Sequence, residues 1–261
     1  MSKRIGAVYS VELSKALRRK YTYVGPALVA AAVAGSLVIR PVARDGMADY
    51  AFIANATLGA LSLVGVLAIL VHGAALVAAE PYGALRHTLT RPIARYEFIL
   101  AKLLLGMTYA AMLTLLAGAL AWGFVFLLGD RNGVLSGSEL IFSEGEMTAA
   151  YVLGALLALA PQWATVAYAL FWSTCTRNPL AAVLLAVGGW VAVDLLKYPL
   201  GIDAYLFTTY VERCWEVFAL RADGLTAAWF PMAWQCLLAS AAGGFLFTAA
   251  AIVRFRRRDL A

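Results

Sequence analysis

The residues best suited to chemistry are concentrated in one stretch, Glu80 to Lys102, which lies between two long apolar runs. Its four cations are Arg86, Arg91, Arg95 and Lys102. A partner protein that bound this stretch would pull directly on both apolar runs. The alternative is an ordinary solvated loop whose arginines only fix the orientation of the chain in a membrane.

The order of residues in this stretch predicts a short helix. Pro81 suits the first helical turn, because its missing N–H would have no intrahelical partner there. Residues 83–90 provide about two turns. Arg91-Pro92 ends them, since the residue before a proline is disfavoured in the α region.

Other residues capable of chemistry are few and scattered. His72 lies inside an apolar run, where an ionisable group is a functional candidate, but the simpler expectation is a neutral imidazole hydrogen-bonded to another helix. His87 is too distant along the chain to share a helix face with it. The three cysteines, Cys175, Cys214 and Cys236, are odd in number and irregularly spaced, which argues against structural disulfides.

The sequence contains no motif of a catalytic or nucleotide-binding site. G-x-x-x-x-G-K-[S/T], H-E-x-x-H and C-x-x-C are all absent, and no serine elbow is placed as a hydrolase requires. We therefore expect a chain that is not an enzyme and that holds no cofactor or metal.

Composition indicates whether the chain folds in water or in a membrane. Of 261 residues, 63% are hydrophobic and only 14% are charged, and the mean hydropathy is +0.80. Soluble domains are about one-quarter charged. The net charge of +6 flanks apolar runs and forms no basic surface, so nucleic acid is not an expected partner.

Uncharged windows long enough to cross a bilayer predict an all-α integral membrane protein with one domain, residues 1–261. A basic amphipathic segment, residues 2–20, should lie in the lipid headgroup region. A secretory signal is the alternative reading of this segment, but its lead-in is long and contains a glutamate. We expect spans at about 21–39, 54–79, 103–128, 149–172, 178–196 and 230–253.

The distribution of Lys and Arg predicts both termini in the cytosol. With that orientation the inner segments hold fifteen of the 21: six before the first span, four in residues 86–102, Arg177, and four in residues 254–258. The outer segments hold the other six. Positive charge accumulates on the cytoplasmic side, so the 80–102 stretch should face the cytosol.

The connection between spans five and six has its own pattern. Asp194 and Lys197 are three residues apart, so we expect them to pair with each other or with a neighbouring subunit. A helical stripe from Leu206 to Phe218 predicts an amphipathic helix in the outer interface, with an aqueous loop as the alternative. Aromatic residues expected at the membrane boundary are Tyr198, Tyr205, Trp215 and Trp229.

Taken in order, these features resemble the membrane subunit of ABC-2 type transporters. That family often begins with E-L-x-x-x-L-R, and residues 12–18 read ELSKALR. Its signature after span two resembles residues 80–95, from Glu80 to Arg95, followed by Lys102. The chain also ends, as members do, in a phenylalanine followed by arginines. It departs from the family at Pro81-Tyr82, Ala84 and His87-Thr88.

The resemblance implies a permease that moves substrate, by export, across a bacterial inner membrane. Residues 81–90 would be a coupling helix docked on a separate ABC ATPase subunit, which would bind the ATP and magnesium. Two ATPase subunits and a second permease subunit, together with membrane lipids, would be the partners. A channel or scaffold without ATP coupling is the alternative.

The same resemblance assigns roles to particular residues. The ATPase-coupling residues would be Glu80, Gly83, Leu85, Arg86, Leu89, Arg91 and Pro92. The outer gate candidates, in the connection between spans five and six, would be Asp194, Lys197, Tyr210 and Phe218.

Overall fold

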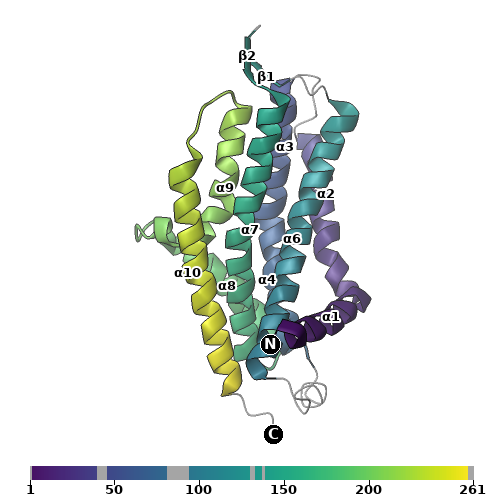
Figure 1. The fold of residues 1–261 in the computed structure, drawn as a ribbon, viewed down its shortest axis with the longest axis vertical. Coiled ribbons are helices and arrows are strands. Elements are labelled where there is room, and N and C mark those ends of the chain that lie inside the picture. The colour runs from purple at the N-terminus through teal and green to yellow at the C-terminus, as the bar shows by residue number, and fades with distance from the viewer. Residues whose placement is uncertain (1, 40–45, 81–93, 130–132, 137–138, 258–261) are drawn as a thin grey trace.

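The computed structural model describes residues 2–39, 46–80, 94–129, 133–136 and 139–257. It is a bundle of long helices that run along one axis, with a short hairpin at one end and a transverse helix near the other (Figure 1). The end that carries the transverse helix is called the lower end below.

The elements follow in this order. The first part contains α1 (Ser2–Arg18), the 3-10 turn η1 (Lys20–Tyr23), α2 (Val24–Ile39), α3 (Gly46–Gly59), the π-helical segment η2 (Ala60–Gly65), α4 (Val66–Ala78) and α6 (Arg95–Leu128). The second part contains β1 (Val134–Ser136), β2 (Glu139–Phe142), α7 (Glu144–Cys175), α8 (Pro179–Lys197), η3 (Asp203–Tyr205), α9 (Phe207–Ala222) and α10 (Trp229–Arg256).

Within the described residues, six helical segments are long and apolar enough to cross a membrane. They are Lys20–Ile39, Ala48–Ala78, Arg95–Leu128, Glu144–Cys175, Pro179–Lys197 and Trp229–Arg256. The expectation of an all-α integral membrane protein with six spans is therefore confirmed. Beside the helices, the described residues include one antiparallel pair of strands, β1 and β2, which sequence analysis did not predict.

Several helix starts follow directly from local sequence. Ser143 and Glu146 cap α7 reciprocally: Glu146 N–H donates to Ser143 Oγ at 3.3 Å, and Ser143 N–H donates to Glu146 Oε2 at 2.8 Å. Asn178 Oδ1 accepts from Leu180 N–H at 2.9 Å at the start of α8, where Pro179 takes the first position.

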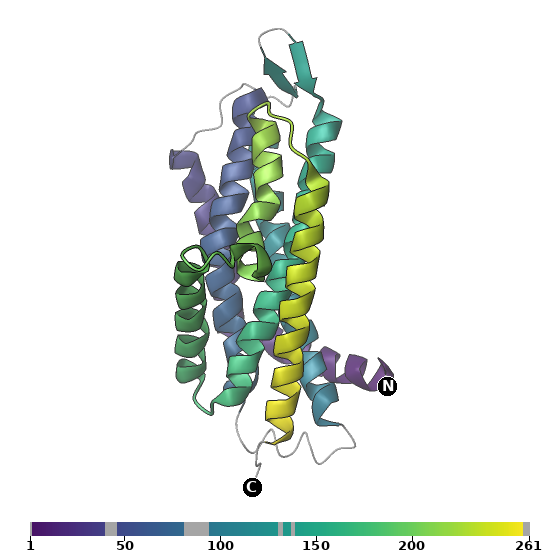
Figure 2. The same cartoon turned by 90° about the vertical axis from the view of Figure 1, so that its left-hand side faces the viewer.

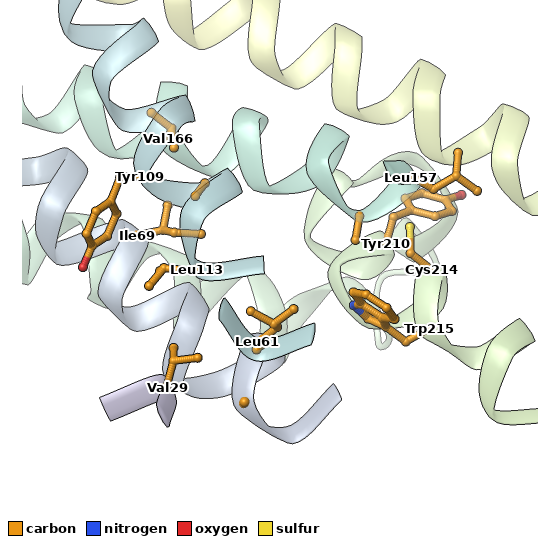
Figure 3. Close-up of a cluster of buried hydrophobic side chains, with 14 of the residues drawn as sticks. Val29, Leu61, Ile69, Tyr109, Leu113, Leu157, Val166, Tyr210, Cys214 and Trp215 are labelled. Atoms are coloured by element: carbon orange, nitrogen blue, oxygen red, sulfur yellow. The ribbon is translucent and has the colours of Figure 1, made fainter. Parts of the chain in front are cut away.

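The core is built from residues of nearly every helix. Figure 3 shows Val29, Leu61, Ile69, Leu113 and others meeting between α2, the α3–α4 span, α6 and α7. Two buried polar side chains also meet inside the bundle, because Thr114 Oγ1 of α6 donates to Gln162 Oε1 of α7 at 2.8 Å. Neither residue was singled out from sequence.

The α9 helix corrects one expectation from sequence. In Figure 2, α8 occupies the lower half of one side, and α9 continues along the upper half, against α3 and α7. The predicted amphipathic helix exists, but its apolar face packs inside the bundle. Trp215, expected at the membrane boundary, is fully buried and contacts Tyr151 with a ring-centroid distance of 5.4 Å. That prediction is wrong, because neighbouring helices rather than lipid cover this face.

Candidate functional site

Three side chains from three separate elements form a buried ion cluster at the lower end of the bundle. Glu12 comes from α1, Glu80 follows the end of α4, and Lys102 lies two turns into α6. The Lys102 ammonium contacts Glu12 Oε2, and its Nζ lies 2.8 Å from Glu80 Oε1. All three side chains are at most 5% exposed. The cluster therefore ties α1 to both flanks of residues 81–93.

The sequence of α1 explains why its glutamate faces inward. Val8, Glu12 and Ala16 are four residues apart, so they share one face of the helix, and all three are buried. Tyr9 adds a second link, because its hydroxyl hydrogen-bonds Thr108 Oγ1 of α6 at 2.9 Å. α1 is thus held on α6 by an apolar stripe with one carboxylate inside it.

Two further cations lie at the rim of the ion cluster. Lys15 Nζ is 2.7 Å from Glu12 Oε1, and Arg19 Nη2 is 3.5 Å from Glu80 Oε1. Lys15 is 39% exposed and Arg19 is 31% exposed. Because water screens such partners, they compensate the two buried carboxylates less than Lys102 does.

Glu12 keeps its charge despite its burial. Burial alone would raise the pKa of its carboxyl, but the adjacent Lys102 ammonium and the hydrogen bonds from Lys102 and Lys15 hold the pKa below its ordinary 4.5. A folded-state pKa below the unfolded value stabilises the fold above pH 4.5, and this stabilisation is lost as the pH falls through the folded-state value.

We therefore expect the thermal unfolding midpoint of the purified chain to fall as the pH is lowered below 4.5. The Glu12→Gln variant should show a shallower fall, since it has no proton to gain at that position. Midpoints measured from neutral to acidic pH for both chains test this. Parallel curves for the two chains would contradict the assigned role of Glu12.

The other flank of residues 81–93 is fixed to the end of α10. Arg95 Nη1 donates to the carbonyls of Phe255 at 3.3 Å and Arg256 at 2.8 Å. These are among the last carbonyls of α10, where the regular helical hydrogen-bond pattern ends. Phe98 stacks on Phe255 with centroids 5.7 Å apart. The start of α6 is therefore anchored to the C-terminal helix.

Of the residues predicted to couple to an ATPase, the structure places only Glu80, which is in the ion cluster. The other predicted coupling residues, Gly83, Leu85, Arg86, Leu89, Arg91 and Pro92, lie outside the described residues. What the structure adds is the environment of their flanks, and both flanks are held by charged side chains with named partners.

The outer gate candidates are not assembled into one site. Lys197 pairs with Asp194 on α8, so the predicted ion pair is confirmed. Tyr210 and Phe218 are fully buried on α9. Tyr210 Oη donates to the Ala204 carbonyl at 2.7 Å, and Phe218 packs on Tyr151. A gating role for these residues stays a prediction.

His72 does not make the hydrogen bond expected from sequence. Neither ring nitrogen has a hydrogen-bond partner among the described residues, although the side chain is buried. Instead the imidazole stacks on Tyr109 of α6 at a centroid distance of 4.0 Å. Both rings line a cavity of about 260 Å³ whose other walls are mainly apolar residues of α2 and the α3–α4 span.

The arrangement at the lower end is a closed ion cluster. In the part of the chain that the structure describes, no group of three or more His, Cys, Asp or Glu residues could hold a metal ion. The carboxylates of the ion cluster are neutralised by cations and closed off from solvent. Such a cluster fixes the relative positions of helices.

The three residues of the ion cluster lie in a part of the sequence that matches a known protein family. A family model described as "ABC-2 family transporter protein" matches residues 9–191. This range includes Glu12, Glu80 and Lys102 and ends within α8. The chain matches no curated protein.

Proposed function

We propose that this chain, which belongs to the ABC-2 family of transporter proteins, couples ATP hydrolysis by a separate ABC ATPase to movement of its membrane spans. The chain is a multi-pass membrane protein and a permease of an ABC transporter. The proposal adds the coupling to ATP hydrolysis, the export direction, and an assembly of two permease and two ATPase subunits.

The observation that carries the proposal is the fixation of both flanks of residues 81–93. Glu80 is bonded through Lys102 to α6 and α1, and Arg95 is bonded to α10. A displacement of residues 81–93 by a bound partner would therefore act on four helices together. In this proposal Arg86 and Arg91 contact the ATPase through charge-assisted hydrogen bonds.

The orientation follows from the charge distribution. Fifteen of the 21 Lys and Arg residues lie in the segments predicted to be cytosolic. α1 and the end of α10, which belong to these segments, lie at the lower end (Figure 1). We assign this lower end to the cytosol, where ATP and the ATPase subunits are present. The hairpin of β1 and β2 then lies outside.

We expect that the amount of ABC ATPase that copurifies with the Arg86→Glu, Arg91→Glu variant is at least tenfold lower than with the wild-type chain. Charge reversal replaces attraction by repulsion at each contact, and two such contacts easily exceed the 1.4 kcal/mol that corresponds to tenfold. Both proteins are co-expressed, the chain is purified by a tag, and the bound ATPase is quantified.

The matched control is Arg254→Glu, Arg257→Glu, which reverses two exposed cations at the same end of the bundle. It should retain the ATPase. Equal recovery of the ATPase with the wild-type chain and the Arg86, Arg91 variant would overturn the docking role and favour a channel or scaffold.

A further inference from the structure

We propose that Cys214 and Cys236 form a disulfide that joins α9 to α10 in the half of the bundle that lies toward the outside of the membrane. The number and spacing of the cysteines argued against a disulfide, but the two sulfur atoms lie 3.4 Å apart, although the residues are 22 positions apart in the sequence. Both side chains are completely buried. Figure 3 shows Cys214 in its cluster, beside Tyr210 and close to Leu157 of α7.

The backbone around Cys214 is held in place by α7 and by the start of α10. Gly154 of α7 has no Cβ, and a Cβ there would lie 3.2 Å from the Cys214 carbonyl oxygen, so α9 packs closely on α7 at this level. One turn earlier on α9, the Tyr210 hydroxyl oxygen lies 3.4 Å from Gln235 Oε1 of α10. The approach of the two cysteines therefore belongs to a packed helix interface.

Cys236 is positioned by an irregularity of α7. Pro161 has no N–H, so the carbonyl of Leu157, four residues earlier, has no helical donor. The Cys236 thiol donates to that carbonyl, with the sulfur 3.8 Å from the oxygen. This weak bond turns the Cys236 sulfur toward α7, on which Cys214 also packs.

Little movement separates the two thiols from a disulfide. A disulfide requires a sulfur–sulfur distance near 2.05 Å, so the sulfurs must approach by roughly 1.4 Å. Small rotations of the two side chains move sulfur atoms by such an amount. Oxidation gives up the weak bond from Cys236 to Leu157 and replaces it with a covalent link between the helices.

The compartment follows from the proposed orientation, on which this inference rests. α9 occupies the half of the bundle opposite α1, and that half faces the outside (Figure 2). Disulfides persist in oxidising compartments outside the cytosol. Cys175 ends α7 at the opposite, lower end, and it has no such partner among the described residues.

The reaction is thiol–disulfide exchange with an oxidising protein disulfide of the outer compartment. One cysteine, as its thiolate, attacks that disulfide and forms a mixed disulfide. The second thiolate then displaces the carrier, which leaves as a dithiol. The chain loses two protons and two electrons, and the carrier disulfide gains them. Because both cysteines are buried in the fold, the exchange takes place before α9 and α10 pack together.

The test counts the cysteines that are joined in a disulfide in the native protein. Cells are treated with N-ethylmaleimide before lysis, and the purified chain is denatured in the presence of the same reagent, so that all free thiols are blocked. One sample is then reduced and another is not, and both are labelled with a maleimide–polyethylene glycol. Without reduction no cysteine should take the label, because every free thiol, Cys175 included, has been blocked and the other two cysteines are joined in the disulfide. After reduction two cysteines should take it.

Two variants act as controls. Cys175→Ser should still give two labels after reduction, and Cys214→Ser should give none. No label on the reduced wild-type chain would overturn the disulfide. Should Cys214→Ser fold poorly, the wild-type chain provides a second measurement: its thermal unfolding midpoint should fall by several degrees with dithiothreitol, and an unchanged midpoint contradicts the link.

A separate labelling experiment distinguishes this failure from failure of the proposed orientation. In a Cys175→Ser chain, an impermeant maleimide applied to intact cells should react with Ser138→Cys and spare Ser2→Cys. With that result, free thiols at 214 and 236 overturn the disulfide alone. The reverse labelling pattern overturns the orientation, and the disulfide with it.

Discussion

Lys102→Met is expected to lower the free energy of unfolding by about 3–5 kcal/mol, because it removes the one buried cation from a site with two buried carboxylates. Methionine keeps most of the side-chain volume, so the effect reports the lost charge. Glu12 and Glu80 would then be only partly compensated by Lys15 and Arg19, which are more exposed.

The thermal unfolding midpoint of the purified chain measures this effect, with an expected decrease of about 10 °C. Lys20→Met is the matched control, because Lys20 is exposed and close to the end of α1. Its midpoint should stay close to that of the wild-type chain. Equal midpoints for Lys102→Met and the wild-type chain would show that the ion cluster does not stabilise the fold.

Neutralising the whole ion cluster is expected to leave the fold stable but to prevent ATP-driven movement at the lower end from reaching the other end of the bundle. The variant Glu12→Gln, Glu80→Gln, Lys102→Met leaves no uncompensated buried charge, and replacement of a complete buried ion group is often neutral for stability. Its midpoint should recover most of the loss caused by Lys102→Met. Its ATPase should still copurify, because the cations at 86 and 91 are unchanged.

Transmission in this neutral variant should fail, since α1, the end of α4 and α6 are no longer joined by charge. Spin labels at Leu17→Cys of α1 and Glu216→Cys of α9, both exposed positions, report the distance between the two ends of the bundle. In a Cys175→Ser complex, ATP with orthovanadate should shift this distance in the parent chain and leave it unchanged in the neutral variant. An equal shift in both would contradict transmission through the ion cluster.

The membrane spans could be predicted from sequence because the bilayer imposes them. A span needs about twenty apolar residues, so uncharged windows identify it without knowledge of its neighbours. The helices extend past the predicted windows at several ends. α6, for example, begins at Arg95, eight residues before the predicted start of its span, because polar residues continue the helix beyond the apolar core.

The position of α9 could not be predicted in the same way. Its apolar stripe shows that one face is covered, but lipid and protein satisfy an apolar face equally well. Trp215 illustrates the ambiguity, since tryptophan is common at membrane boundaries and also in packed cores. The packing of α9 on α3 and α7, including the close approach at Gly154, decides the matter, and this packing consists of tertiary contacts.

The ion cluster was visible in sequence only as separate motif positions. Glu12 and Lys102 are 90 residues apart, and no local pattern joins them. One local signal was present: Glu12 lies four residues from both Val8 and Ala16, in the stripe that faces the bundle. A charged residue in an apolar stripe indicates a buried partner, and Lys102 is that partner. The stacking of His72 on Tyr109 had no comparable signal.

The central claim is that residues 81–93 contact an ABC ATPase in the cytosol. Site-specific photo-cross-linking in intact cells tests this contact most directly. A photoreactive benzophenone amino acid is placed at position 86 in one chain and at position 138 in another, each co-expressed with the ATPase. We predict a covalent adduct of the chain with the ATPase from position 86 and none from position 138. An adduct from position 138, or none from position 86, would contradict the account.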